Sequence, residues 1–270
     1  MRPLRLIERV EWRALGAWRC IDVATGLPIA TPLEVIAPPD AEVIRNRSGV
    51  YVVNYYAPLA DHNNAFMVPP ALPAPESVAL PVTLRDPTGF YLARSAEIRL
   101  PRDSQPDNAG TAGSLFNPVD VELYRSPAAA VGANWVALRV SLSEQSSGDA
   151  LGGALLRVRS NGRTLARGQS DWRGEALVPV VGVPITTWSE DEDAVVTTTV
   201  DATLEAFFDP TAGGLRTPAV QVAAGRAPIS PPVPDPLRTE SNPAAARGQA
   251  AIRLATGQSL ALSMTLDLPD

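Results

Sequence analysis

The chain has 270 residues, of which 45% are hydrophobic, with 27 Pro, 19 Gly and a net charge of −6 at pH 7. This composition excludes a generally basic nucleic-acid-binding surface and favours a turn-rich, all-β globular protein. No apolar run approaches the roughly 20 residues that cross a bilayer, and charged side chains recur through the first 20 residues. We therefore expect no membrane insertion, and cytoplasmic synthesis without a signal peptide, after which the chain either stays in the cytoplasm or is incorporated into a particle.

Short strands are predicted along the first hundred residues. Alternating apolar positions favour strands within residues 4 to 23 and at 33 to 36, 50 to 55 and 96 to 100. A type I turn is expected at 86 to 89, where Pro87 presets its backbone φ angle and Gly89 follows. Residues 57 to 81 are rich in Pro, Ala and Asn, which is typical of a long surface excursion. His62 in this stretch is expected to be a solvated loop residue.

The domain organisation follows from a polar stretch at residues 103 to 114, which predicts a linker. It separates an N-terminal β-sandwich, residues 1 to 102, from a second sandwich at 115 to 226. Strands of the second unit are expected at 119 to 124, 135 to 142 and 195 to 208. Residues 227 to 270 predict a Pro-rich arm and a C-terminal β-hairpin that turns at Thr256 and Gly257, with alternating Leu residues returning to a sheet.

A short sequence pattern occurs twice. In it, a turn that begins with a polar residue and ends with Gly joins two strands whose apolar and polar residues alternate. The copies turn at Asn46 to Gly49 and at Asp171 to Gly174. An Asp or Asn here hydrogen-bonds its own turn, and Gly supplies the positive φ that a tight hairpin needs. Two related sandwich units are the simplest interpretation.

The second copy resembles the carboxypeptidase regulatory-like or transthyretin-like β-sandwich family over about 30 residues. The residues that carry this resemblance are Gly153, Ala154, Leu155, Arg157, Val158, Gly162, Ala166, Gly168, Ser170, Asp171, Gly174 and Leu177. The resemblance implies a Greek-key sandwich that serves as an accessory, adhesion or structural module and has no catalytic residues of its own. Together with the repeated pattern, it predicts an all-β fold of two tandem Greek-key sandwiches, transthyretin-like or Ig-like. The Arg-rich and Pro-rich sequence is also similar to the sequences of auxiliary structural proteins of phage-tail-like contractile injection particles.

The sequence offers few groups for catalysis or metal binding. It has no Gly-x-Ser-x-Gly, Walker or His-Glu-x-x-His motif, and His62 and Cys20 are the single residues of their kinds. One imidazole makes a poor metal site, so no metal or cofactor is expected. Cys20 is predicted to be a buried, unreactive thiol. The acidic run at 190 to 193 lacks the spacing of a calcium loop and is interpreted as solvated.

Pro232, Pro234 and Pro236, with the neighbouring Leu237, are the candidate partner-binding residues. Prolines preorganise an extended segment and so lower the entropy lost on docking, although a linker fits the same pattern. We expect a non-enzymatic structural or adaptor protein of a contractile injection particle, which binds other proteins; a homo-oligomer is a further alternative. The alternatives are a module that binds carbohydrate or a surface through the loops at 57 to 81 and 189 to 194, and a small hydrolase using Asp or Glu pairs.

Overall fold

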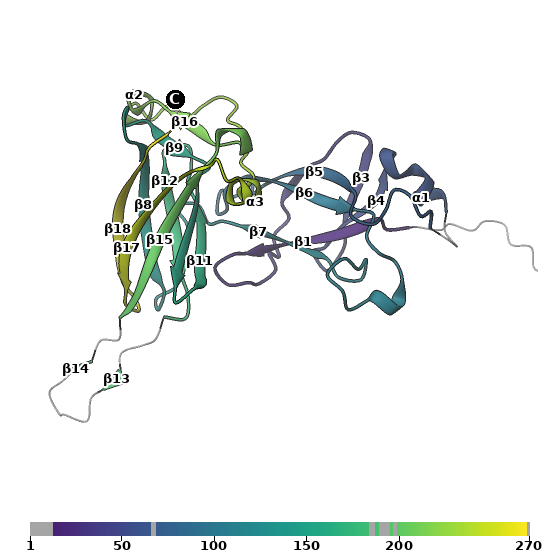
Figure 1. The fold of residues 1–270 in the computed structure, drawn as a ribbon, viewed down its shortest axis with the longest axis horizontal. Coiled ribbons are helices and arrows are strands. Elements are labelled where there is room, and N and C mark those ends of the chain that lie inside the picture. The colour runs from purple at the N-terminus through teal and green to yellow at the C-terminus, as the bar shows by residue number, and fades with distance from the viewer. Residues whose placement is uncertain (1–12, 66–68, 184–186, 189–194, 197–198, 269–270) are drawn as a thin grey trace, which may run out of the picture.

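The fold is all-β, as predicted, in a computed structural model that describes residues 13–65, 69–183, 187–188, 195–196 and 199–268. Two β-sandwiches lie side by side along the long axis (Figure 1). The N-terminal sandwich is purple to blue at the right, and the C-terminal sandwich is teal to yellow at the left. Each has its own hydrophobic core.

The N-terminal sandwich packs a four-stranded sheet on a three-stranded sheet. The four strands run in the order β3 (Ala41–Arg45), β4 (Tyr51–Tyr56), β1 (Gly16–Asp22) and β7 (Val119–Leu123), and the three in the order β2 (Glu34–Ile36), β5 (Val78–Arg85) and β6 (Arg94–Leu100). Trp18 is fully buried in the core and stacks on Tyr51 with ring centroids 5.4 Å apart. Cys20 is buried beside them, as predicted.

Strand β7 shows how the chain returns to its starting sheet. It pairs in parallel with β1, from Trp18 opposite Val119 to Asp22 opposite Leu123. The sequence assigned residues 119 to 123 to the second unit. Their alternation shows that one face is buried, but it does not show in which core.

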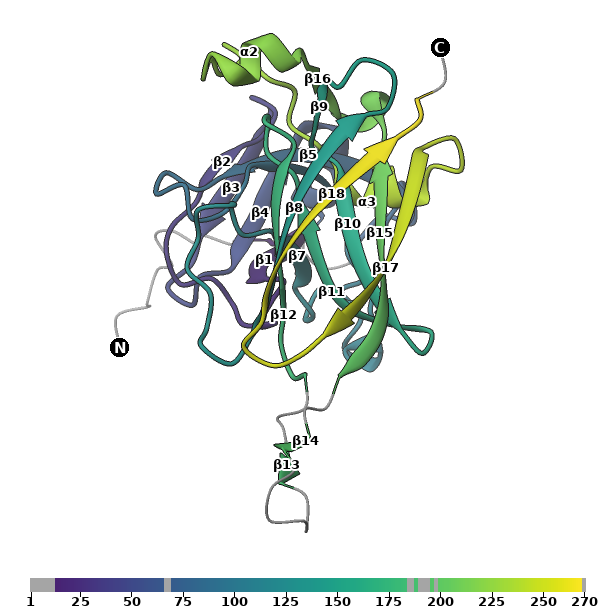
Figure 2. The ribbon, with the colours of Figure 1, turned by 90° about the vertical axis from the view of Figure 1, so that its left-hand side faces the viewer.

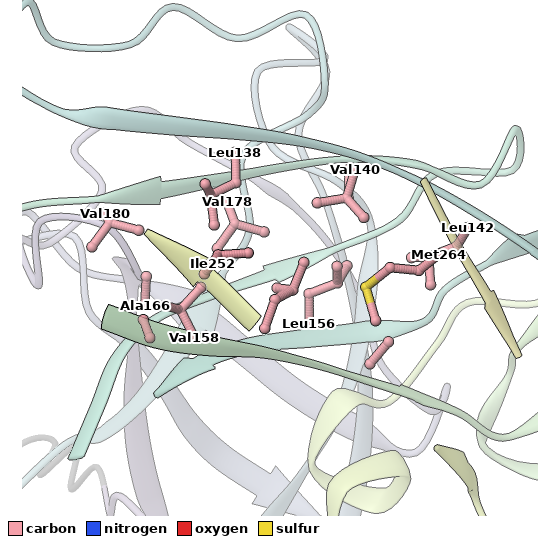
Figure 3. Packing of buried hydrophobic residues seen from close by; sticks show 14 of the residues in the cluster. Leu138, Val140, Leu142, Leu156, Val158, Ala166, Val178, Val180, Ile252 and Met264 are labelled. Atoms are coloured by element: carbon pink, nitrogen blue, oxygen red, sulfur yellow. The ribbon is translucent and has the colours of Figure 1, made fainter. Parts of the chain in front are cut away.

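The C-terminal sandwich packs a four-stranded sheet on a five-stranded sheet around a mainly aliphatic core (Figure 3). One sheet runs in the order β11 (Arg163–Gln169), β10 (Leu155–Ser160), β15 (Val200–Phe208) and β17 (Ala246–Leu254). The other contains β12 (Glu175–Val180), β8 (Val136–Glu144), β9 (Ala150–Gly152), β16 (Leu215–Thr217) and β18 (Ser259–Leu266). Figure 3 shows Leu138, Val178 and Ile252 projecting into the space between the sheets.

The predicted C-terminal hairpin is wrong, because its two strands enter different sheets. Strand β17 pairs with β15, from Val200 opposite Leu254 onward, whereas β18 pairs in parallel with β8. The turn after β17 therefore passes from one sheet to the other at the end of the sandwich (Figure 2). The expected return of the alternating Leu strand to a sheet is confirmed. Leu266 is 1% exposed.

The turn chemistry of the repeated pattern is confirmed at both copies. The Asn46 Oδ1 accepts from the backbone N–H of Ser48 and Val50, at 3.0 and 2.9 Å. The Asp171 Oδ1 accepts from the N–H of residues 173 and 175, at 2.8 and 3.1 Å. Gly49 and Gly174 have φ of +81° and +74°. The two turns have the same bonds at the same offsets, which is why these residue types recur.

The remaining elements are short. The helical turns are η1 (Ala57–Leu59), α1 (Ala60–Asn64), η2 (Pro106–Asn108), η3 (Pro210–Ala212), α2 (Ala219–Ala223) and α3 (Pro236–Ser241). Strands β13 (Thr187–Trp188) and β14 (Val195–Val196) pair at the end of the C-terminal sandwich opposite α2 (Figures 1 and 2). Among the described helices, none is long and apolar enough to cross a membrane.

An ion pair anchors the crossing from one sandwich to the other. Arg125, just after β7, donates Nη2–H to the Asp22 Oδ2 at 2.7 Å, and both side chains are almost fully buried. The Arg125 guanidinium also lies 4.6 Å from the centre of the Trp135 ring, at the start of the second unit. The segment that leaves β7 is thus held to β1 by an ion pair and contacts the start of the second unit through an aromatic ring.

Candidate partner-binding cleft

The Pro-rich arm crosses from the C-terminal sandwich and binds the edge of the N-terminal one. The backbone N–H of Ser95, in β6, donates to the Pro234 carbonyl at 2.8 Å, and the Ser95 hydroxyl donates to the Val233 carbonyl at 3.2 Å. The N–H of Asp235 donates to the Ala212 carbonyl at 2.8 Å. The arm therefore bonds to both halves of the molecule within three residues.

Two glycines form the surface of the C-terminal sandwich that contacts the arm. A Cβ added to Gly213 would lie 2.6 Å from the Val233 carbonyl oxygen and 2.8 Å from the Pro234 Cα. One added to Gly153 would lie 3.0 Å from the Pro234 Cβ. Both glycines have positive φ, +89° and +75°, where other residues are strained. The glycine pattern behind the family resemblance thus includes a residue that lets the arm approach closely.

Asp235 turns the arm into a helix and brings a buried charge to the junction. It caps α3 by accepting from the N–H of Leu237 and Arg238, at 3.1 and 3.3 Å, and Pro236 occupies the first turn. Its Oδ1 lies 3.9 Å from the Arg94 Nη2, and the two side chains are 9% and 2% exposed. Arg94 also donates to the Glu122 carbonyl at 2.7 Å.

A network of five charged side chains extends the junction across α3. The Arg157 guanidinium pairs with Glu205 at 2.7 Å and with Glu240 at 2.5 Å. Arg167 pairs with Glu240 and with Glu122, each at 3.3 Å. Burial opposes the charge on Arg167, but the Glu122 and Glu240 carboxylates outweigh it and raise its pKa. Because Glu122 lies in β7, this network also links the two sandwiches.

A small cleft of ≈ 190 Å³ remains beside the docked arm. Its walls include Leu92, Trp172, Leu215, Pro232 and Pro234. Gln169 also lines the cleft and is 2% exposed. Its Nε2 donates to the Ala93 carbonyl at 3.3 Å, whereas its Oε1 has no hydrogen-bond partner among the described residues. A buried acceptor without a donor is costly, so an incoming N–H or O–H that reached this atom would be stabilised there.

The structure divides the predicted partner-binding residues into two groups. Pro234 and Pro236 are buried in contacts within the chain, whereas Pro232 and Leu237 are exposed, Leu237 to 57%. Binding of another protein by these four residues stays a prediction. The sequence did not indicate Gln169 or Trp172, because their positions beside the arm depend on contacts across both sandwiches.

Other candidate groups lie away from the cleft. The prediction that His62 is solvated is wrong: it lies in α1 and is 3% exposed. Cys20 has a pKa raised to about 12, chiefly by burial. No group of three metal-ligating side chains occurs within the described ranges. The acidic run at 190 to 193 and the loop at 189 to 194 lie outside those ranges.

Comparison with known proteins gives distant fold likenesses. No protein-family model and no curated protein sequence matches the chain. A structure of Klebsiella pneumoniae 5-hydroxyisourate hydrolase is similar with a TM-score of 0.24 and 16% identity, covering 50% of this chain and 92% of that one. The Bacillus anthracis TIE protein is similar with a TM-score of 0.23 and 8% identity, covering 95% of this chain. This chain spans only 34% of the TIE protein.

The comparisons correct one prediction. The sequence led us to expect no enzyme, and this is contradicted by the hydrolase among the similar structures, so we withdraw it. TM-scores this low assign no activity to this chain. A β-sandwich fold agrees with the predicted family resemblance, and the finer family membership remains a resemblance.

Proposed function

We propose that this chain is a structural or adaptor protein of a larger assembly, and that the cleft beside the arm receives a segment of a partner protein. The observation that carries the proposal is the buried Gln169 Oε1, left without a described donor between apolar walls. A polypeptide brings the two groups this cleft needs, a backbone N–H for the acceptor and an apolar side chain for Trp172 and Pro232.

The size of the cleft supports a side chain rather than a free small molecule. Pockets for drug-sized ligands have about 300–1,000 Å³, above the ≈ 190 Å³ found here. The docked arm holds Pro232 in place through its neighbours, which lowers the entropy lost on binding. The specific assembly we propose, a phage-tail-like contractile injection particle, rests on the resemblance of the sequence.

Photo-crosslinking from the cleft tests the proposal in the native host. Benzoylphenylalanine placed at Trp172 should crosslink to one partner protein, and the crosslink should weaken in Gln169→Leu, which removes the acceptor. The matched control is the same group at Phe116, an aromatic residue that is 56% exposed elsewhere on the chain. If position 172 yields no crosslinks beyond those of position 116, the cleft is not a partner site.

A further inference from the structure

A second cavity, of ≈ 310 Å³, lies in the N-terminal half, away from the arm. Its walls combine seven apolar residues with Arg13, His62, Arg102 and Asp103; the apolar residues are Ala14, Leu15, Pro69, Pro70, Ala71, Pro75 and Pro101. Several come from the stretch at 57 to 81, which the sequence predicted as a surface excursion. Its volume reaches the lower limit of small-molecule sites.

Three buried nitrogen atoms on the walls have no hydrogen-bond partner among the residues that the structure describes. They are Nη1 of Arg13, Nε of Arg102 and Nδ1 of His62. His62 and Arg102 are only 3% and 8% exposed. Arg102 has its other two nitrogens bound, to Glu76 and to the Ala112 carbonyl, which fixes the guanidinium in place. Such buried polar atoms require a partner.

The unpaired Nδ1 of His62 can meet a hydroxyl group in either tautomer of the ring. Burial and the nearby Arg13 charge lower the pKa of His62, which favours the neutral imidazole. In a neutral imidazole Nδ1 is either a donor or an acceptor, and a hydroxyl group can take the opposite role in each case.

We propose that this cavity binds a small hydroxycarboxylate. The N–H groups of Arg13 and Arg102 suit the two oxygens of a carboxylate, and the His62 Nδ1 suits the hydroxyl beside it. Arg102 is already paired with Glu76, no described residue forms an ion pair with Arg13, and Asp103 adds a negative charge to the same wall. A ligand with a single negative charge therefore fits better than a phosphate dianion. The proline walls contact its carbon chain.

The single histidine of the chain gives a direct readout. Lactate added to the full chain should shift the His62 Cε1–H proton resonance in a saturable way, at constant ionic strength. Acetate, which lacks the hydroxyl, should bind at least several-fold more weakly. Arg13→Gln should weaken lactate binding roughly 10-fold or more, the scale of a lost charged hydrogen bond.

Arg47→Gln is the matched control, because Arg47 is an exposed arginine of the same sandwich. It should bind lactate like the unmodified chain. Arg13 lies outside the strands, and its replacement should leave the unfolding transition in place. The proposal is overturned if lactate causes no saturable shift, if acetate, phosphate or glucose binds as well as lactate, or if Arg13→Gln and Arg47→Gln bind lactate equally.

Discussion

The backbone N–H of Ser95 donates to the Pro234 carbonyl at 2.8 Å, joining the edge strand β6 of the N-terminal sandwich to the arm that leaves the C-terminal one. This bond holds the arm against the N-terminal sandwich, and the arm forms one wall of the cleft beside it. Two of the prolines that suggested an extended arm line this cleft. Pro234 is buried in contacts within the chain, whereas Pro232 is exposed.

The contact between Gly213 and the arm should be lost at a large cost in stability when a single methyl group is added. Gly213→Ala places a Cβ against Val233 and Pro234 in a left-handed conformation, and should lower the free energy of unfolding by about 2–4 kcal/mol. Gly162→Ala is the control, because Gly162 has a φ of +76° and no atom within 4 Å of an added Cβ. Urea denaturation should show a loss of only about 1 kcal/mol there. Equal losses would mean that the arm does not press on Gly213.

The buried ion pair between Asp22 and Arg125 should contribute far more to the free energy of unfolding than an exposed ion pair does. Asp22→Asn leaves the Arg125 charge buried without its counter-ion and should cost about 3–5 kcal/mol. Asp201→Asn breaks the pair with Arg253, whose side chains are 82% and 78% exposed, and should cost less than about 1 kcal/mol. Denaturant titration measures both losses. A loss below 1 kcal/mol for Asp22→Asn would show that the pair is hydrated in solution.

Cys20 should be inert while the protein is folded. A pKa of about 12 leaves roughly one thiolate in ten thousand at pH 8, and burial blocks access to it. Ellman's reagent should therefore label the thiol only as fast as the chain unfolds, and at once in denaturant. Rapid labelling of the folded chain would contradict the burial.

The only histidine should control stability near neutral pH. Its pKa is lower when folded than its ordinary value of 6.5, so the unfolded chain binds the proton more tightly. Stability should therefore fall as the pH drops from about 7 through 6.5 and down to the folded pKa, below which His62 causes no further loss.

His62→Gln removes this group and should flatten the slope of unfolding free energy against pH in that window. Carboxylates whose pKa values are lowered, such as Asp86 and Asp209, lose their contribution at more acidic pH and serve as the internal reference. An unchanged slope between pH 7 and 5.5 would indicate a solvated imidazole.

Local chemistry in the sequence predicted the strands and turns well. The Asn46 and Asp171 turns form because an Asx side chain bonds the amides that follow it, which depends on neighbours only. Alternation likewise predicted that the last strand has a buried face.

Pairing and burial across the fold could not be predicted in this way. A period of two says which side chains face a core, but β7 and β17 could each join more than one sheet. His62 reads as polar in sequence, yet α1 packs it under the proline-rich stretch. The cleft depends on Gln169 and Pro232, 63 positions apart (232 minus 169), meeting beside the docked arm.

In the proposed function the chain acts within an assembly through the cleft beside its arm. Sedimentation of the untagged protein from its native host, with Gln169→Leu in parallel, tests this most directly. We predict that the unmodified chain sediments in a large particle with repeated structural proteins, and that the variant shifts toward the free chain of 28.6 kDa. Recovery of the unmodified chain only as a free monomer would contradict the account.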